Sequence, residues 1–205
     1  LFDETYIKDI VERNKVKNIS ELEELIDLMA SSVGSLANPN RISNTLLSVK
    51  KTTVDPQTVK NYLMHLENAF LLSEVKRYDV KGRKYINTPL KYYFEDIGLR
   101  NARLNFRQLE EPHLMENIVY SELRMRGYNI DVEVVETNER EEDRYIRKQL
   151  EIDFIANKGN DKFYIQVSQG LSVPGKRKQE IASLIKVRDG FKKVLIRKDN
   201  PISYI

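Results

Sequence analysis

The segments Glu151-Ile152-Asp153-Phe154 and Tyr164-Ile165-Gln166-Val167-Ser168 set the architecture of the second half of the chain. Both lie in apolar runs of strand length, and the Gly159-Asn160 pair between them is typical of a hairpin turn. In each run a polar residue, Asp153 or Gln166, interrupts the apolar pattern. We therefore predict two paired strands, one of which carries Asp153 and the other Gln166.

Further elements flank these strands. The apolar spacing predicts a helix from Pro112 to Gly127, where Gly127 acts as a C-terminal stop signal. Strands are expected at 130–135, 150–156, 162–167 and 191–196, a second helix at 176–187, and an exposed loop at 139–143. The order helix, three strands, helix, strand predicts a mixed α/β domain over residues 101–205.

The first 95 residues are predicted to be mostly helical. Ser20 and Glu23 have the three-residue spacing of a capping box at the start of one helix. Asp55-Pro56 starts another, which has one apolar face made of Val59, Leu63, Leu66 and Phe70. A short helix is expected between them at 41–49, and strands at 71–75 and 84–86 are expected to pair afterwards. Three helices followed by a hairpin is the order of a winged-helix domain, which we place at residues 1–100.

The composition limits the class of protein. The 205 residues allow two small domains, each long enough to bury a core. The chain has no cysteine, which excludes disulfides and thiolate metal sites. No apolar run approaches the roughly 20 residues that a membrane span needs. No N-terminal signal pattern is present, so we expect a cytoplasmic protein with no membrane partner.

Three residues form the strongest candidate for chemistry: Glu116 in the helix at 112–127, Asp153 and Gln166. A hard cation such as Mg²⁺ prefers oxygen ligands and polarises both water and a phosphodiester. With these residues, the second half resembles the restriction-endonuclease-like superfamily, the PD-(D/E)xK nucleases. The resemblance implies that Glu116, Asp153 and Gln166 are catalytic and that the carboxylates of Glu116 and Asp153 hold Mg²⁺.

The sequence departs from that pattern at one position. The family has a lysine two residues after the Glu or Gln, and this chain has Ser168 there. Serine cannot supply the positive charge, so Lys162 or Lys176 would have to reach the site. This replacement favours a degenerate nuclease-like domain over an active one.

The whole chain resembles the C-terminal region of a prokaryotic family of predicted ATPases of the AAA type. The segments that carry the resemblance are 1–10, 59–63, 66–72, 92–99 and 115–123. Where the family usually has Pro-Lys before its Tyr-Phe-x-Asp run, this chain has Pro89-Leu90-Lys91. The resemblance implies that ATP binds only through a module that precedes Leu1 and is absent from this chain.

Local charge matters more than the net charge of +3, which results from 34 basic and 31 acidic residues. Residues 76–84 contain five basic residues and one acid, and residues 170–198 contain nine and two. Together with the exposed positions of the third predicted helix, they give the candidate nucleic-acid contacts: Thr58, Lys60, Asn61, Lys76, Arg77, Lys81, Arg83, Lys84, Lys176 and Arg177.

Three functional hypotheses remain open from the sequence. The first is a DNA-binding or regulatory module of an ATPase. The second is an active Mg²⁺-dependent DNA endonuclease. The third is a scaffold that binds other proteins or associates with itself.

Overall fold

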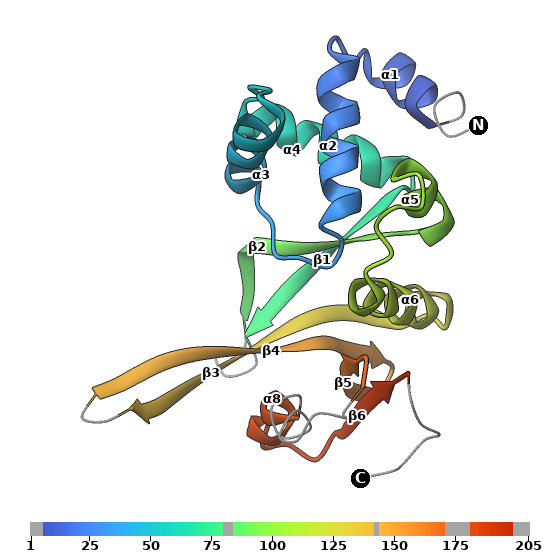
Figure 1. Cartoon of the computed structure of the whole chain (residues 1–205). Helices are drawn as coiled ribbons and strands as arrows, with labels where there is room; N and C mark the ends of the chain where they lie inside the picture. The colour runs from blue at the N-terminus through green and yellow to red at the C-terminus, as the bar shows by residue number, and fades with distance from the viewer. Residues whose placement is uncertain (1–5, 80–83, 142–143, 171–180, 199–205) are drawn as a thin grey trace. The chain divides into compact units, whose positions relative to one another are not determined.

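The chain folds as a mixed α/β protein in this computed structural model (Figure 1), as the sequence predicts. The structure describes residues 6–79, 84–141, 144–170 and 181–198, the side chains of residues 88 and 135–149 excepted. Within these ranges, every helix is too short or too polar to cross a membrane.

The chain divides into two compact units, and each is made of two separate segments. Unit 1 comprises residues 1–74 and 88–117, and unit 2 comprises residues 75–87 and 118–205. The predicted basic hairpin and most of the predicted helix at 112–127 are therefore grouped with the C-terminal residues. The sequence-based division at residue 100 cuts the chain once. Each compact unit instead combines two segments that are separated in the sequence.

Unit 1 contains the N-terminal helices. They are α1 (Lys8–Asn14), α2 (Ile19–Ser31), α3 (Pro39–Thr45), a π-helical turn η2 (Leu46–Lys50), α4 (Pro56–Asn68) and α5 (Ile97–Arg103). The predicted helices at the positions of α2 and α4 are confirmed, and the helix expected at 41–49 is divided between α3 and η2. The sequence analysis missed α1 and α5.

Helix caps explain where these helices begin. Asp55 caps α4 as predicted, because its carboxylate accepts a hydrogen bond of 2.7 Å from the backbone N–H of Gln57. The predicted cap of α2 is wrong. Asn18 rather than Ser20 is the N-cap, and it exchanges hydrogen bonds with Glu21. The helix therefore begins before the predicted capping box.

The core of unit 1 includes the apolar face predicted for α4, since Val59, Leu63 and Leu66 are buried. The prediction for Phe70 is wrong, because its side chain is 79% exposed. Helix α4 ends at Asn68, and Phe70 has a φ of 55°, in the left-handed region. The chain therefore leaves the helical path before the fourth position of the apolar face.

Unit 2 is built on a sheet whose described strands have the order β2-β1-β3-β4-β5-β6. The strands are β1 (Leu72–Asp79), β2 (Lys84–Phe94), β3 (Asn129–Glu141), β4 (Arg144–Lys158), β5 (Asp161–Ser168) and β6 (Lys192–Arg197). Strands β3, β4 and β5 are antiparallel neighbours, and the pairs β1–β3 and β5–β6 are parallel. Strands β1 and β2 continue into unit 1.

The strands of unit 2 confirm the predicted order but differ in length. The loop predicted at 139–143 is wrong, because β3 and β4 pair up to Glu141 and Arg144 and form a long hairpin (Figure 1). Residues 142–143, and residues 80–83 before the strand expected at 84–86, lie outside the described residues.

Two helices belong to this unit. Helix α6 (Glu111–Met125) enters it from unit 1 at Ile118, and α8 (Ala182–Lys186) is the described part of the helix expected at 176–187. Tyr120 of α6 packs against Phe154 of β4, with ring centroids 6.2 Å apart. Leu184 of α8 packs with Ile152, Ile155 and Tyr164. Both helices therefore contact the sheet through apolar or aromatic side chains.

Candidate functional site

The central feature of unit 2 is an irregularity in strand β4 at Asp153. Asp131 pairs with Ile155, but Glu133 pairs with Ile152, so β4 has one extra residue between these pairs. Such a bulge redirects side chains locally. The carboxylate of Asp153 accepts hydrogen bonds of 2.8 Å from the backbone N–H of Val167 and from Nε2 of Gln166.

The structure therefore brings two of the predicted site residues, Asp153 and Gln166, into direct contact. A third residue joins them, because Oε1 of Gln166 accepts a hydrogen bond of 3.4 Å from the hydroxyl of Ser183 in α8. Asp153 and Ser183 are both buried. The sequence analysis missed Ser183, since a single serine in a short helix carries no recognisable signal. We call Asp153, Gln166 and Ser183 the polar triplet.

The cation expected near this site is not Lys162. Its ammonium lies 5.0 Å from the ring centroid of Phe191, and Lys162 is four residues from Gln166, about 13 Å along a strand. Lys176 lies outside the described residues. Ser168 is buried, and its partner in the β5–β6 register is Arg197. The basic residue that the structure places beside the motif position therefore comes from β6.

Glu116, the third predicted ligand, has its contacts in unit 1. Its carboxylate lies 2.7 Å from the ammonium of Lys91 and accepts a hydrogen bond from the hydroxyl of Tyr93. The side chains of Lys91 and Glu116 are only 5% and 13% exposed. Gly34 closes over them with a φ of 73°, and an added Cβ there would lie 3.4 Å from Oε1 of Glu116. Glu116 is thus the acid of a buried ion pair.

The metal site stays a prediction. In the ranges that the structure describes, no group of three or more acidic or histidine side chains is arranged to hold a metal ion. Asp153 and Gln166 are adjacent in unit 2, and Glu116 is paired in unit 1.

The predicted nucleic-acid contacts of α4 lie on its outer side. Lys60 and Asn61 are exposed, and Thr58 is half-buried. The side chain of Asn61 accepts a hydrogen bond of 3.1 Å from the amide of Gln57. These residues therefore remain available as surface contacts of unit 1.

The predicted contacts of the hairpin divide into two groups. Lys76 and Lys84 are exposed. Arg77 in β1 is only 6% exposed, so its burial does not agree with the predicted nucleic-acid contact. Strand alternation explains the difference, because neighbouring side chains point to opposite faces of a sheet. The other four candidates, Lys81, Arg83, Lys176 and Arg177, lie outside the described residues.

Two lysines of unit 2 lie beside exposed aromatic rings. The ammonium of Lys76 lies 6.0 Å from the ring centroid of Tyr85, and that of Lys162 lies 5.0 Å from the centroid of Phe191. Tyr85 and Phe191 are 54% and 43% exposed. We call these four residues the lysine–aromatic surface. Of these four residues, the sequence analysis named only Lys76 as a candidate nucleic-acid contact.

Asp131 connects the two halves of this surface. Burial raises the pKa of Asp131, while a hydrogen bond of 3.4 Å from the Tyr85 hydroxyl and the charges of Lys76 and Lys162 oppose that rise. Both lysines therefore act on the same carboxylate, although they are far apart in the sequence. A second set of contacts pairs Lys158 with Tyr128 and Lys192 with Phe163.

One buried acid in unit 2 has a different environment. Glu133 of β3 is 0% exposed, and neither of its carboxylate oxygens has a hydrogen-bond partner among the described residues. Burial and the neighbouring Asp189 raise the pKa of Glu133 to about 7, although Lys162 opposes this rise. Glu133 therefore changes charge near neutral pH.

The chain belongs to a family described as a domain of unknown function (DUF8612), whose model matches residues 1–110. It is 37% identical over 196 residues to an uncharacterized protein of Haemophilus influenzae, which covers 96% of this chain and 45% of that protein. It is 28% identical over 178 residues to the uncharacterized protein MJ1544 of Methanocaldococcus jannaschii, covering 86% and 37%. The chain thus spans less than half the length of these relatives.

A search of solved structures matches the crystal structure of protein VC1899 from Vibrio cholerae. The identity is 14%, the TM-score is 0.28, and the match covers 91% of this chain and 49% of the other.

Proposed function

We propose that this chain is a nucleic-acid-binding module, in which unit 2 contacts the phosphate backbone and exposed bases. The observation that carries the proposal is the lysine–aromatic surface. Lysine ammonium groups neutralise phosphates, and exposed rings stack on bases without regard to sequence. Single-stranded DNA is the preferred ligand, because its bases are accessible for stacking.

The charges of this surface are available to a ligand. Among the described residues, neither Lys76 nor Lys162 has a carboxylate within ion-pair distance. Their contacts with Tyr85 and Phe191 are weak, on the order of 1 kcal/mol at an exposed site. A phosphate can therefore attract each ammonium while the ring next to it receives a base.

The proposed module would serve a larger ATPase. The resemblance of the chain to the C-terminal region of predicted AAA-type ATPases supports this idea. The relatives are more than twice as long as the part that the chain covers, which leaves room for an ATP-binding module. In this view residues 1–100 have the winged-helix-like fold and residues 101–205 the nuclease-like fold.

Binding is tested by fluorescence anisotropy with a labelled single-stranded oligonucleotide at several salt concentrations. We expect binding at low salt that weakens steeply as salt rises. Lys76→Ala/Lys162→Ala should weaken it about tenfold or more, and Tyr85→Ala/Phe191→Ala by a similar factor. Lys17→Ala is the matched control, because Lys17 is an exposed lysine of unit 1.

The result that contradicts this proposal is the absence of salt-dependent binding by the wild-type chain. That outcome would favour the scaffold hypothesis, which size-exclusion chromatography with light scattering can test through the oligomeric state.

A second candidate function is Mg²⁺-dependent cleavage of DNA. The contact between Asp153 and Gln166 favours it, and Arg197 beside Ser168 offers a positive charge where the motif lysine is missing. Asp153 would hold the metal ion, and Arg197 would stabilise the charge that develops on the phosphate.

The test is nicking of a supercoiled plasmid with Mg²⁺ or Mn²⁺. Asp153→Asn, which keeps the size and an acceptor oxygen of the side chain, should abolish cleavage without loss of the fold. Equal nicking by wild type and variant would reject the assignment of Asp153 as a catalytic residue.

A further inference from the structure

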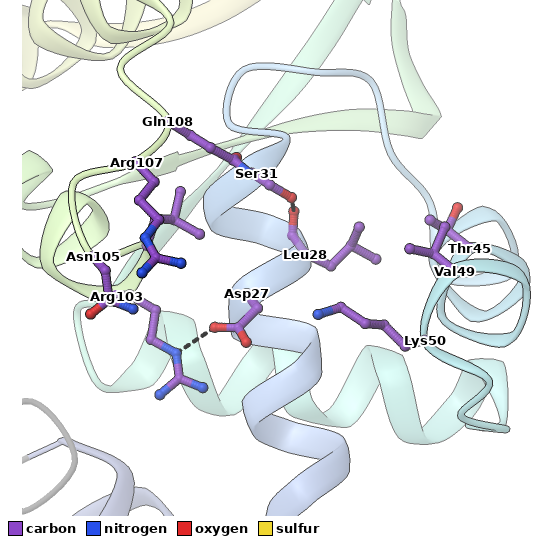
Figure 2. A pocket seen from close by; sticks show the side chains of 11 residues that line it. Asp27, Leu28, Ser31, Thr45, Val49, Lys50, Arg103, Asn105, Arg107 and Gln108 are labelled. Atoms are coloured by element: carbon purple, nitrogen blue, oxygen red, sulfur yellow. Dashed lines mark hydrogen bonds and ion pairs between the residues drawn. The ribbon is translucent and has the colours of Figure 1, made fainter.

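Unit 1 contains a cavity of about 400 Å³ between α2, η2 and the loop that follows α5 (Figure 2). This volume is in the range of pockets that hold small molecules. Every residue that lines the cavity lies within residues 1–110, the region that the family model matches. The cavity therefore belongs to the part of the chain that defines the family.

Positive charge dominates the lining. Lys50, Arg103 and Arg107 face a single acid, Asp27. Nε of Arg103 lies 2.5 Å from the carboxylate of Asp27, so these two charges neutralise each other. Among the described residues, the side chains of Lys50 and Arg107 have no ion-pair or hydrogen-bond partner. Two positive charges thus remain uncompensated at the cavity.

The loop that carries Arg107 is held in an unusual conformation. Asn105 and Phe106 both have positive φ angles, 50° and 56°, although neither is glycine. Such residues cost about 1–3 kcal/mol each and persist only where their surroundings impose them. Here the backbone N–H of Phe106 donates to the carbonyl of Asn101 at 2.8 Å, and that of Arg107 donates to the carbonyl of Leu104 at 3.1 Å.

A buried arginine fixes the end of the same loop. Arg100 donates from Nε to the carbonyl of Ala30 at 2.7 Å and from another nitrogen to the carbonyl of Gln108. Its guanidinium therefore ties the loop to the end of α2. Arg107 and Gln108 consequently reach the cavity from a backbone that is already ordered.

We propose that this cavity binds a phosphorylated small molecule of about mononucleotide size. A phosphate monoester carries nearly two negative charges at neutral pH, which matches the two uncompensated charges of Lys50 and Arg107. The side-chain amides of Asn105 and Gln108 offer further donors. Leu28 and Leu104 supply an apolar wall for the rest of the ligand. This assignment is independent of the nucleic-acid surface in unit 2.

The test is isothermal titration calorimetry of the whole chain at low salt with ATP, ADP, AMP, inorganic pyrophosphate and adenosine. We expect at least one of the phosphate compounds to bind and adenosine to bind at least tenfold more weakly. Lys50→Ala and Arg107→Ala should each weaken binding about tenfold, since each removes a charge-assisted hydrogen bond. Both side chains are exposed and unpaired, so circular dichroism should show an intact fold.

Lys17→Ala is the matched control, because Lys17 is exposed in unit 1 and does not line the cavity. The proposal is overturned if no phosphate compound binds at millimolar concentration, or if Lys50→Ala/Arg107→Ala binds as tightly as the wild type. Equal affinity for AMP and adenosine would also overturn it.

A single-stranded oligonucleotide provides a further test ligand. If it alone binds, and the double variant abolishes its binding, the cavity is a nucleic-acid contact and the small-molecule assignment is wrong.

Discussion

Glu116 in unit 1 and Glu133 in unit 2 are buried carboxylates with opposite surroundings. In unit 1, Glu116 meets the ammonium of Lys91 and the hydroxyl of Tyr93. In unit 2, Glu133 has no hydrogen-bond partner among the described residues. A paired charge is a fixed part of the fold, whereas a charge without a cationic partner can respond to a proton or a ligand. Of these two acids, Glu133 is therefore the one whose charge we expect to change with pH.

The largest loss of stability is expected from Lys91→Met in unit 1. The substitution leaves Glu116 buried without a cation and should lower the free energy of unfolding by about 3 kcal/mol. Urea unfolding followed by circular dichroism measures the change.

Two variants serve as controls for Lys91→Met. Lys91→Met/Glu116→Leu should regain much of the loss, because no unpaired charge remains. Lys8→Ala removes an exposed pair with Glu12, in which both side chains are 68% exposed, and should change stability by less than about 1 kcal/mol. If Lys8→Ala and Lys91→Met have equal effects, the ion pair of unit 1 does not stabilise the fold.

A smaller loss is expected from Asp153→Ala in unit 2. The backbone N–H of Val167 and the amide of Gln166 lose their acceptor, which should cost about 2 kcal/mol. Asp153→Asn keeps an acceptor and should cost about half as much. Urea unfolding again gives both values. Equal losses for the two variants would mean that the negative charge, rather than the acceptor geometry, is what the bulge requires.

The contact within the polar triplet follows from local sequence, but only in part. A hairpin at Gly159-Asn160 pairs Phe154 with Ile165, so Asp153 and Gln166 become neighbours on adjacent strands. The bulge that turns Asp153 toward the N–H of Val167 has no sequence signal, and Ser183 comes from a helix that is distant in the chain. The sequence therefore predicts which residues are close, whereas the tertiary structure determines their hydrogen-bond partners.

The start of α2 shows why local patterns fail. Asn18 and Ser20 are both followed three residues later by a glutamate, so each pattern predicts a capping box. The structure uses Asn18 and Glu21, and the hydroxyl of Tyr62 in α4 contacts Glu21 at 3.3 Å. A tertiary contact distinguishes the two alternatives. The cavity of unit 1 is likewise invisible in the sequence, because Asp27, Lys50 and Arg107 come from three distant segments.

A pH dependence is expected from Glu133 in unit 2. Its pKa is raised from 4.5 to about 7 in the folded protein. The folded state therefore binds the proton more tightly than the unfolded state, and the free energy of unfolding falls as pH rises from 4.5 to 7. Glu133→Gln mimics the protonated acid, so it should be more stable than the wild type by about 3 kcal/mol at pH 8 and about equal to it at pH 4.5.

Urea unfolding at pH 4.5, 6 and 8 measures this difference. Asp161→Asn is the control, because Asp161 is an exposed acid of the same unit and its loss should leave the pH dependence unchanged. If Glu133→Gln shows the same pH dependence as the wild type, Glu133 is compensated by a cation. The surroundings of Glu133 and Glu116 would then be alike, and the contrast between these two acids would be wrong.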